Sequence, residues 1–276
     1  MMIWQCGPFS LAVDRPRVMG ILNVTPDSFS DGGAYESAVA AVEHARRLVD
    51  DGADIIDVGG ESTRPGAEPV PVELELARVI PVVAALADVG VPISIDTVKP
   101  EVMVTALEAG ASIVNDVNGL RAPGAVEAVA ASECGVVVMH MQGEPKTMQD
   151  APSYHDVVDE VTAFLTERTA ALVAAGVAHE RIAVDPGIGF GKTFAHNLAL
   201  IRCLGDLLGL GRPMVIGLSR KGLIGTITGR DVADRDAGSV AAALIAAERG
   251  ARILRVHDVR ATCDALAVWR SIGSSA

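Results

Sequence analysis

Residues 251–260 read ARILRVHDVR, and residues 238–250, just before them, read GSVAAALIAAERG. The earlier run has the composition of a helix closed by glycine, and the later one begins as a short apolar strand. Because side chains alternate faces along a strand, we expect Ile253, Arg255 and His257 on one face. A buried cation is costly unless an opposite charge pairs with it. Arg255 therefore predicts either a carboxylate partner elsewhere in the chain or an anionic ligand.

The same strand–helix pattern occurs eight times along the chain. Each predicted strand is almost wholly apolar and ends in a polar or glycine-rich turn, which is typical of a parallel sheet covered by helices. Eight units also close a (β/α)₈ barrel of about 250 residues, whereas an open doubly wound sheet, the alternative, rarely needs eight regular units. The predicted strands begin at Val18, Asp54, Pro92, Ser112, Gly135, Arg181, Pro213 and Ala251.

We therefore predict an α/β protein with a (β/α)₈ TIM barrel fold. The barrel is expected to form a single domain over residues 1–276, with its core at about residues 18–272. The first 17 residues precede the first strand and are expected to cap the floor of the barrel.

Charge and composition exclude several classes of partner. The 23 basic and 35 acidic residues give a net charge of −12, and the chain has no long basic run, so we expect neither nucleic-acid nor acidic-membrane binding. The N-terminus lacks the features of a signal peptide, and no apolar run is long enough to span a membrane. The four cysteines are scattered without metal-binding spacing, which favours reduced thiols in a cytoplasmic protein.

Polar side chains follow every predicted strand at its carboxyl end, where the catalytic groups of such barrels lie. Each alone has an ordinary explanation, since a strand-end Asp commonly caps a helix and a histidine commonly packs in a core. Because eight strands converge on one rim, the set together predicts a site. Its members are Asn23, Glu61, Thr63, Arg64, Asp96, Asn115, Asp116, His140, Gln142, Asp185, Ser219, Arg220, Lys221, Arg255 and His257.

The cations of this set predict an anion site. Arg255, His257 and Lys221, together with Arg64, form a cluster suited to a phosphate-like group. On this reading Arg255 serves the ligand and not the core, so its replacement by alanine is expected to leave the fold intact.

The remaining polar groups predict a site for a flat heterocycle. Asp96, Asn115 and Asp185 offer two carboxylates and an amide to an amino-amidine edge such as that of a pterin or guanine. Met139 offers a soft apolar wall for the ring. In the alternative, Asp185 pairs with Lys221 or Arg255 in a purely structural ion-pair network.

Two glycine-rich stretches have further readings. PGIGFGKT at residues 186–193 is not a P-loop, since Pro186 stands where that motif requires glycine. The loop is instead expected to bring Phe190 against a flat ligand. SDGG at residues 30–33 belongs to a long first loop that is either simply solvated or a lid.

Eight motifs resemble the signatures of dihydropteroate synthase from about residue 18 to residue 259. They read GILNVTPDSFSDGG, DIIDVGGESTRPGA, ISIDT, NDVNG, VMHMQGEPKTMQ, DPGIGFGK, GLSRKG and RVHDV. The resemblance implies a (β/α)₈ barrel that condenses 6-hydroxymethyl-7,8-dihydropterin pyrophosphate with 4-aminobenzoate to 7,8-dihydropteroate and pyrophosphate. It also implies a Mg²⁺ requirement, inhibition by sulfonamides and a homodimer.

The resemblance further implies roles for individual residues. The catalytic residues would be Asp31, Thr63, Lys221, Arg255 and His257. The pterin would be bound by Asp96, Asn115, Met139, Asp185 and Lys221, and the pyrophosphate by Asn23, Arg64, Arg255 and His257. The aminobenzoate would contact Thr63, Phe190, Arg220 and Gly222, and Asn23 would be the metal ligand. Many family members carry serine at the position of Gly222, so weaker or water-assisted binding of the benzoate carboxylate is expected here.

Strong anion stabilisation without an obvious base favours a stepwise, SN1-like reaction in which pyrophosphate leaves before the amine attacks. Two alternatives are a methyltetrahydrofolate-dependent methyltransferase and a catalytically silent pterin-binding paralogue. The first would not need Arg255 and His257 arranged for pyrophosphate, and the second would be expected to lose the loop residues Asp31, Thr63 and Arg64.

Overall fold

The computed structural model describes residues 2–25, 34–63 and 66–273, with the side chains of residues 34–37 left out. The strands are β1 (Ile3–Cys6), β2 (Phe9–Ala12), β3 (Arg17–Asn23), β4 (Ile55–Gly59), β5 (Ile93–Asp96), β6 (Ile113–Asp116), β7 (Gly135–Met139), β8 (Ile182–Asp185), β9 (Val215–Gly217) and β10 (Ile253–Val256). The α-helices are α1 (Ala34–Asp50), α2 (Val72–Leu86), α3 (Pro100–Glu108), α4 (Ala125–Ala130), α5 (Val157–Ala174), α6 (Phe194–Arg202), α7 (Gly222–Thr228), α8 (Asp236–Glu248) and α9 (Val259–Gly273). Short 3₁₀ helices are η2 (His179–Arg181), η3 (Asp206–Leu210) and η4 (Val232–Asp234).

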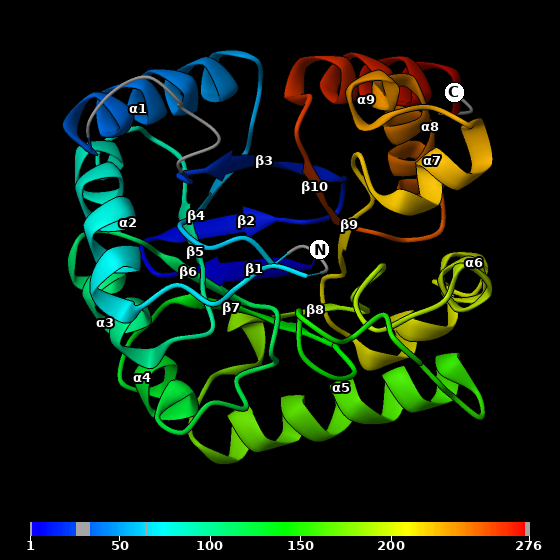
Figure 1. Cartoon of the computed structure of the whole chain (residues 1–276), viewed down its shortest axis with the longest axis horizontal. Coiled ribbons are helices and arrows are strands. Elements are labelled where there is room, and N and C mark those ends of the chain that lie inside the picture. The colour runs from blue at the N-terminus through cyan, green and yellow to red at the C-terminus, as the bar shows by residue number, and fades with distance from the viewer. Residues whose placement is uncertain (1, 26–33, 64–65, 274–276) are drawn as a thin grey trace.

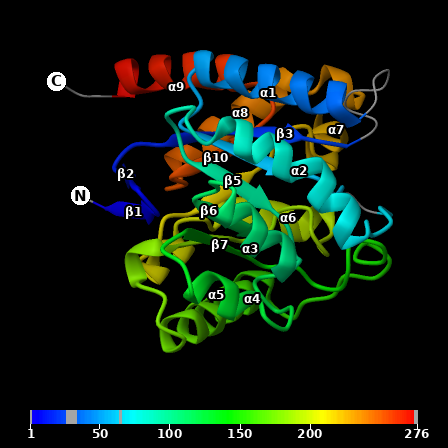
Figure 2. The same ribbon diagram turned by 90° about the vertical axis from the view of Figure 1, so that its left-hand side faces the viewer.

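Eight of these strands form the predicted parallel barrel. They pair in the order β8-β7-β6-β5-β4-β3-β10-β9. The two ends of this order meet through a parallel bridge between Val184 and Met214 and a 2.9 Å hydrogen bond from the N–H of Val184 to the carbonyl of Pro213. The helices lie around the outside of the strands (Figures 1 and 2). The TIM barrel prediction is confirmed, with each of the eight predicted strands in place.

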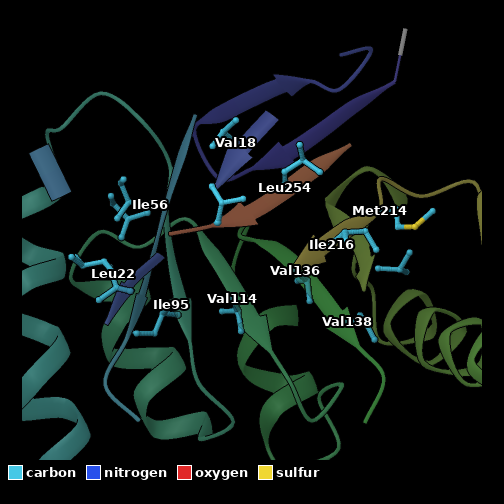
Figure 3. Packing of buried hydrophobic residues seen from close by; sticks show 14 of the residues in the cluster. Val18, Leu22, Ile56, Ile95, Val114, Val136, Val138, Met214, Ile216 and Leu254 are labelled. Carbon is cyan, nitrogen blue, oxygen red and sulfur yellow. The ribbon is translucent and has the colours of Figure 1, made fainter. Parts of the chain in front are cut away.

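Alternation along the strands divides their side chains between two regions. One set points outward and packs against the helices in a continuous apolar core. Figure 3 shows members of this set, namely Val18, Leu22, Ile56, Ile95, Val114, Val136, Val138, Met214, Ile216 and Leu254. The other set points into the barrel. Its side chains are apolar near the amino ends of the strands and polar near the carboxyl ends.

The floor of the barrel is apolar and is capped by the N-terminal hairpin of β1 and β2. Trp4 is fully buried there and donates its indole N–H to the carbonyl of Arg181 at 2.9 Å. The hairpin packs on the lowest inward side chains of the strands, which are Met19, Ile55, Ile113, Val137, Ala183, Val215 and Ile253. The predicted capping role of the first 17 residues is therefore confirmed.

Within the described ranges, none of the helices is both long enough and apolar enough to cross a membrane.

Candidate active site

The upper ends of the strands bring polar side chains to one level inside the barrel. In the sheet register Gly59 pairs with Asn23 on one side and with Asp96 on the other. Asp96 pairs in turn with Asn115. A methyl group built on Gly59 would lie 3.6 Å from Asp96 Cβ and 4.0 Å from Asn23 Oδ1, so glycine keeps the space between them open. The predicted convergence of Asn23, Asp96 and Asn115 is what the structure shows.

Arg255 is paired with carboxylates of the chain itself. It shares the inward face of β10 with Ile253, and its guanidinium donates from Nε to Asp57 at 2.6 Å and from Nη2 to Asp96 at 2.7 Å. Asp57 is fully buried and also accepts from the Asn115 amide at 3.3 and 3.4 Å. The carboxylate partners of Arg255 are therefore Asp57 and Asp96, and not Asp185 as in the structural alternative.

These contacts correct one expectation. Arg255 does not serve a ligand alone, because it neutralises a carboxylate that no water reaches. Burial acts to lower the pKa of Arg255, but Asp57 and Asp96 outweigh it and raise that pKa above the ordinary value. Removing Arg255 is therefore expected to reduce stability as well as any activity.

Asp96 combines an ion pair with an unused acceptor. Its Oδ2 faces Arg255, whereas its Oδ1 is buried and has no hydrogen-bond partner in the described part of the chain. Burial raises the pKa of Asp96 to about 7, with Arg255 opposing this and Asp57 adding to it. A buried acceptor without a donor is costly, so this oxygen marks a place where a ligand N–H would be favourable.

On the other side of the barrel, Met139 and Asp185 are direct neighbours in β7 and β8. Met139 is 4 % exposed and belongs to a small apolar cluster against which the partly buried Phe190 packs. Asp185 Oδ1 accepts the N–H of Gly187 at 2.7 Å, and burial raises the pKa of Asp185 while Lys221 acts to lower it. Asp185 lies two residues after the inward-facing Ala183 on β8, so its carboxyl is on the inward face of the strand.

Lys221 lies at the start of α7 and reaches back across the loop that follows β8. It donates to the carbonyl of Ile188, and its Nζ lies 4.8 Å from the centre of the Phe190 ring. Burial lowers the pKa of Lys221 to about 8, although Asp185 acts to raise it. Neither Lys221 nor Arg255 forms an ion pair with Asp185 among the described residues, so the structural alternative for that carboxylate is not supported.

The other predicted residues stand at the edge of this site. His257 Nδ1 lies 2.9 Å from Ser219 Oγ, which also accepts the backbone N–H of His257 at 3.2 Å. Arg220 makes a two-point ion pair with Asp236 at 2.8 and 3.1 Å. Gly222 begins α7 and is exposed.

The second loop is described only in part. Thr63 is half-buried on the loop after β4. Its neighbour Arg64, and Asp31 on the first loop, lie outside the described residues.

Three strand-end residues have structural roles instead. Asp116 points to the outer face and accepts the N–H groups of Asn118 and Leu120 at 2.6 and 2.8 Å. Glu61 forms an ion pair with Lys99. Gln142 exchanges two hydrogen bonds with the backbone of Ser153.

His140 packs inside the protein, which is the common role of a histidine at the end of a strand. It lies edge-on to Phe164 with ring centres 4.9 Å apart, and its Nδ1 lies 2.9 Å from Lys192 Nζ. Burial, with a contribution from Lys192, lowers the pKa of His140 to about 3, so the ring is neutral. Lys192 is 2 % exposed, and its position in the sequence does not by itself indicate this contact.

The chain resembles known proteins over nearly its whole length. A family model described as pterin binding enzyme matches residues 19–257. A dihydropteroate synthase from Neisseria meningitidis serogroup C is 53% identical over 276 residues, covering 98% of each chain. The structure of a Xanthomonas albilineans dihydropteroate synthase with 4-aminobenzoic acid superposes with a TM-score of 0.94, at 54% identity and 99% coverage of both chains. A Burkholderia cenocepacia dihydropteroate synthase complexed with 7,8-dihydropteroate gives 0.91, at 51% identity, covering 99% of this chain and 96% of that one.

Proposed function

The chain belongs to the pterin-binding enzyme family and, within it, to the dihydropteroate synthases, and from that premise we propose the reaction and the residues that perform it. The enzyme condenses 6-hydroxymethyl-7,8-dihydropterin pyrophosphate with 4-aminobenzoate to 7,8-dihydropteroate and pyrophosphate. The observation that carries the residue assignments is the buried Oδ1 of Asp96, which lies at the level of Asn115 and has no hydrogen-bond partner among the described residues.

The pterin is proposed to lie between the two carboxylates. Asp96 Oδ1 and Asp185 Oδ2 accept the N–H groups of the amino-amidine edge, and the Lys221 ammonium donates to the ring carbonyl. Met139 packs on the face of the ring. The raised pKa values of both carboxyls follow from burial, and a ligand that donates to them repays part of that cost.

The pyrophosphate is proposed to lie toward β10. Arg255 uses Nε and Nη2 for its carboxylates, which leaves Nη1 to donate, and its side chain is 22% exposed. His257 follows at the end of the same strand, on the same face. A guanidinium already oriented by two carboxylates costs little further ordering when an anion arrives.

Mg²⁺ is proposed as the cofactor, with Asn23 as its ligand from the chain. The described residues contain no group of three or more His, Cys, Asp or Glu side chains that would hold a metal by themselves. A single amide oxygen at the rim fits an ion that keeps several waters and binds chiefly through substrate phosphates. Bound there, Mg²⁺ would supply positive charge to the leaving pyrophosphate.

The geometry favours departure of pyrophosphate before the amine attacks. Arg255, His257 and Lys221 stabilise the anion that forms, and the buried carboxylates of Asp96 and Asp185 stabilise the positive charge on the exocyclic carbon of the pterin. A neutral aniline nitrogen then attacks that carbon without needing a strong base. Phe190, Thr63 and Arg220 are proposed to line the aminobenzoate side, with the sulfonamides competing there.

The direct test is an assay for pyrophosphate release from the dihydropterin pyrophosphate with and without 4-aminobenzoate and Mg²⁺. We expect 7,8-dihydropteroate and pyrophosphate in equal amounts only with both substrates and the metal. A silent paralogue would bind the pterin and release nothing. A methyltransferase would instead demethylate a methyltetrahydrofolate in the presence of a corrinoid acceptor.

The order of bond breaking can be tested by positional isotope exchange. The oxygen that joins the pterin methylene carbon to phosphorus is labelled with ¹⁸O. The substrate is then incubated with enzyme and Mg²⁺ but without 4-aminobenzoate. A stepwise reaction moves the label into non-bridging positions of the recovered substrate, because the C–O bond breaks and reforms. A label that stays in the bridge, with pyrophosphate released only when amine is present, would favour direct displacement.

A homodimer and a cytoplasmic location complete the proposal. Exposed apolar side chains on neighbouring elements support the dimer, namely Ile227 on α7, Val232 on η4 and Ile245 on α8. Sedimentation of the wild type and of Ile227→Glu tests it, the variant being expected to sediment as a monomer. All four cysteines are free thiols, which supports a reducing compartment.

A further inference from the structure

The loop between β8 and α6 is fixed to an unusual degree. Every backbone carbonyl from Gly187 to Gly191 accepts a hydrogen bond from a side chain. The donors are Lys192 to Gly187 at 2.9 Å, Lys221 to Ile188, Gln149 to Gly189 at 2.7 Å, Lys192 to Phe190 at 3.0 Å and Tyr154 to Gly191 at 2.7 Å. One side chain, Lys192, thus supplies two of the five bonds.

Lys192 is placed so that all three of its ammonium hydrogens have a near acceptor. Besides the carbonyls of Gly187 and Phe190, its Nζ lies 2.9 Å from Nδ1 of His140. The neutral state of His140 leaves Nδ1 free to accept, and the edge contact with Phe164 holds the ring in position. A lysine that is 2 % exposed and has no carboxylate in ion-pair contact among the described residues is held by these acceptors.

The same loop has no room to shift toward its neighbour. A methyl group on Gly187 would lie 1.9 Å from the carbonyl oxygen of His140, and one on Gly191 would lie 2.2 Å from that of Gln142. The loop therefore rests directly on the segment that follows β7, and Lys192 joins the two from within.

We propose that Lys192 is a positioning residue for the aminobenzoate side of the site. By holding the carbonyls on both sides of Ile188 and Gly189, it sets the Phe190 ring and the Ile188 carbonyl against Lys221. The ring lies 4.8 Å from Lys221 Nζ, so a shift of the loop would move both the ring that lines this side of the site and the carbonyl that holds Lys221. This role rests on the proposed function for its substrate, but the loop geometry does not.

The test compares Lys192→Met, which keeps an unbranched chain as far as the ε carbon but removes the ammonium donors, with Lys192→Gln, which keeps one donor group. Tyr154→Phe is the matched control, because it removes one of the five bonds, that to the Gly191 carbonyl, and leaves the bonds of Lys192 in place. Steady-state kinetics should show a KM for 4-aminobenzoate raised roughly tenfold or more in Lys192→Met, with kcat within about threefold of the wild type. The KM of Lys192→Gln should lie between those of the wild type and Lys192→Met, and the KM of Tyr154→Phe should stay close to that of the wild type.

Hydrogen exchange of the ligand-free proteins gives a readout that needs no activity. The amides of Gly187, Gly189 and Phe190 are hydrogen-bonded in the wild type, and peptides spanning residues 186–191 should exchange faster in Lys192→Met. If the wild type makes no dihydropteroate, the proposed function fails while this measurement still decides the role of Lys192.

Unchanged exchange in these peptides, or an unchanged KM for 4-aminobenzoate, would overturn the proposal. So would an equal loss in the kinetics of Tyr154→Phe. Should Lys192→Met not fold, the same comparisons are made with Lys192→Gln, for which a smaller rise in KM and faster exchange are expected.

Discussion

Arg255→Ala is expected to lower the free energy of unfolding by about 3 kcal/mol and to abolish most of the synthase activity. The first effect follows because Asp57 is fully buried, and loss of its partner leaves an uncompensated charge inside the barrel. The second follows because the same guanidinium is proposed to stabilise the departing pyrophosphate, a contact of a kind worth roughly 100-fold to 1000-fold in rate. Urea unfolding and the pyrophosphate assay measure the two effects separately.

A double variant separates the structural from the catalytic contribution. In Arg255→Ala/Asp57→Asn the buried charge is removed with its partner, so most of the lost stability should return while activity stays low. Arg255→Ala with the stability of the wild type would show that Asp57 finds another partner or a proton. Recovery of activity in the double variant would show that Arg255 acts only by neutralising Asp57.

The fold could be predicted because it depends on a local pattern. Each strand carries the apolar run and terminal turn of a parallel barrel, and alternation along the strand already places Ile253, Arg255 and His257 on one face. The same alternation separates Asn115, which enters the site, from its neighbour Asp116, which caps a turn on the outside. The alternation that separates them can be read from the sequence, although the predicted set of strand-end residues included both Asn115 and Asp116.

The partners of these residues could not be predicted in the same way. Asp57 has the inward position on β4, between Ile55 and Gly59, but the residue that it neutralises lies 198 positions away along the chain. Lys192 follows a glycine-rich loop, and rejecting the P-loop reading left its ammonium without an assigned contact. Its acceptors are backbone carbonyls and a histidine nitrogen, whose directions depend on the folded loop and leave no trace in residue types.

Asp185→Ala is expected to weaken binding of a phosphate-free pterin by about 100-fold, roughly the worth of one hydrogen bond to a charged acceptor. The carboxylate stands beside Met139 on the inward face of β8, and its Oδ1 accepts the N–H of Gly187. Asp185→Asn should bind more tightly than the alanine variant but less tightly than the wild type, since an amide offers one acceptor where the carboxylate offers two.

Asp116→Asn is the matched control for this experiment. Asp116 is also a buried strand-end carboxylate, and burial raises its pKa to about 6, but it faces the helices and accepts from its own turn. We expect this variant to lose stability and to keep the pterin affinity of the wild type. Calorimetry with 6-hydroxymethylpterin, which carries no phosphate, keeps the anion site out of the measurement. Equal affinity in Asp185→Ala and the wild type would remove Asp185 from the ring site. An equal loss of pterin affinity in Asp116→Asn would mean that general destabilisation, and not contact with the ring, accounts for the effect.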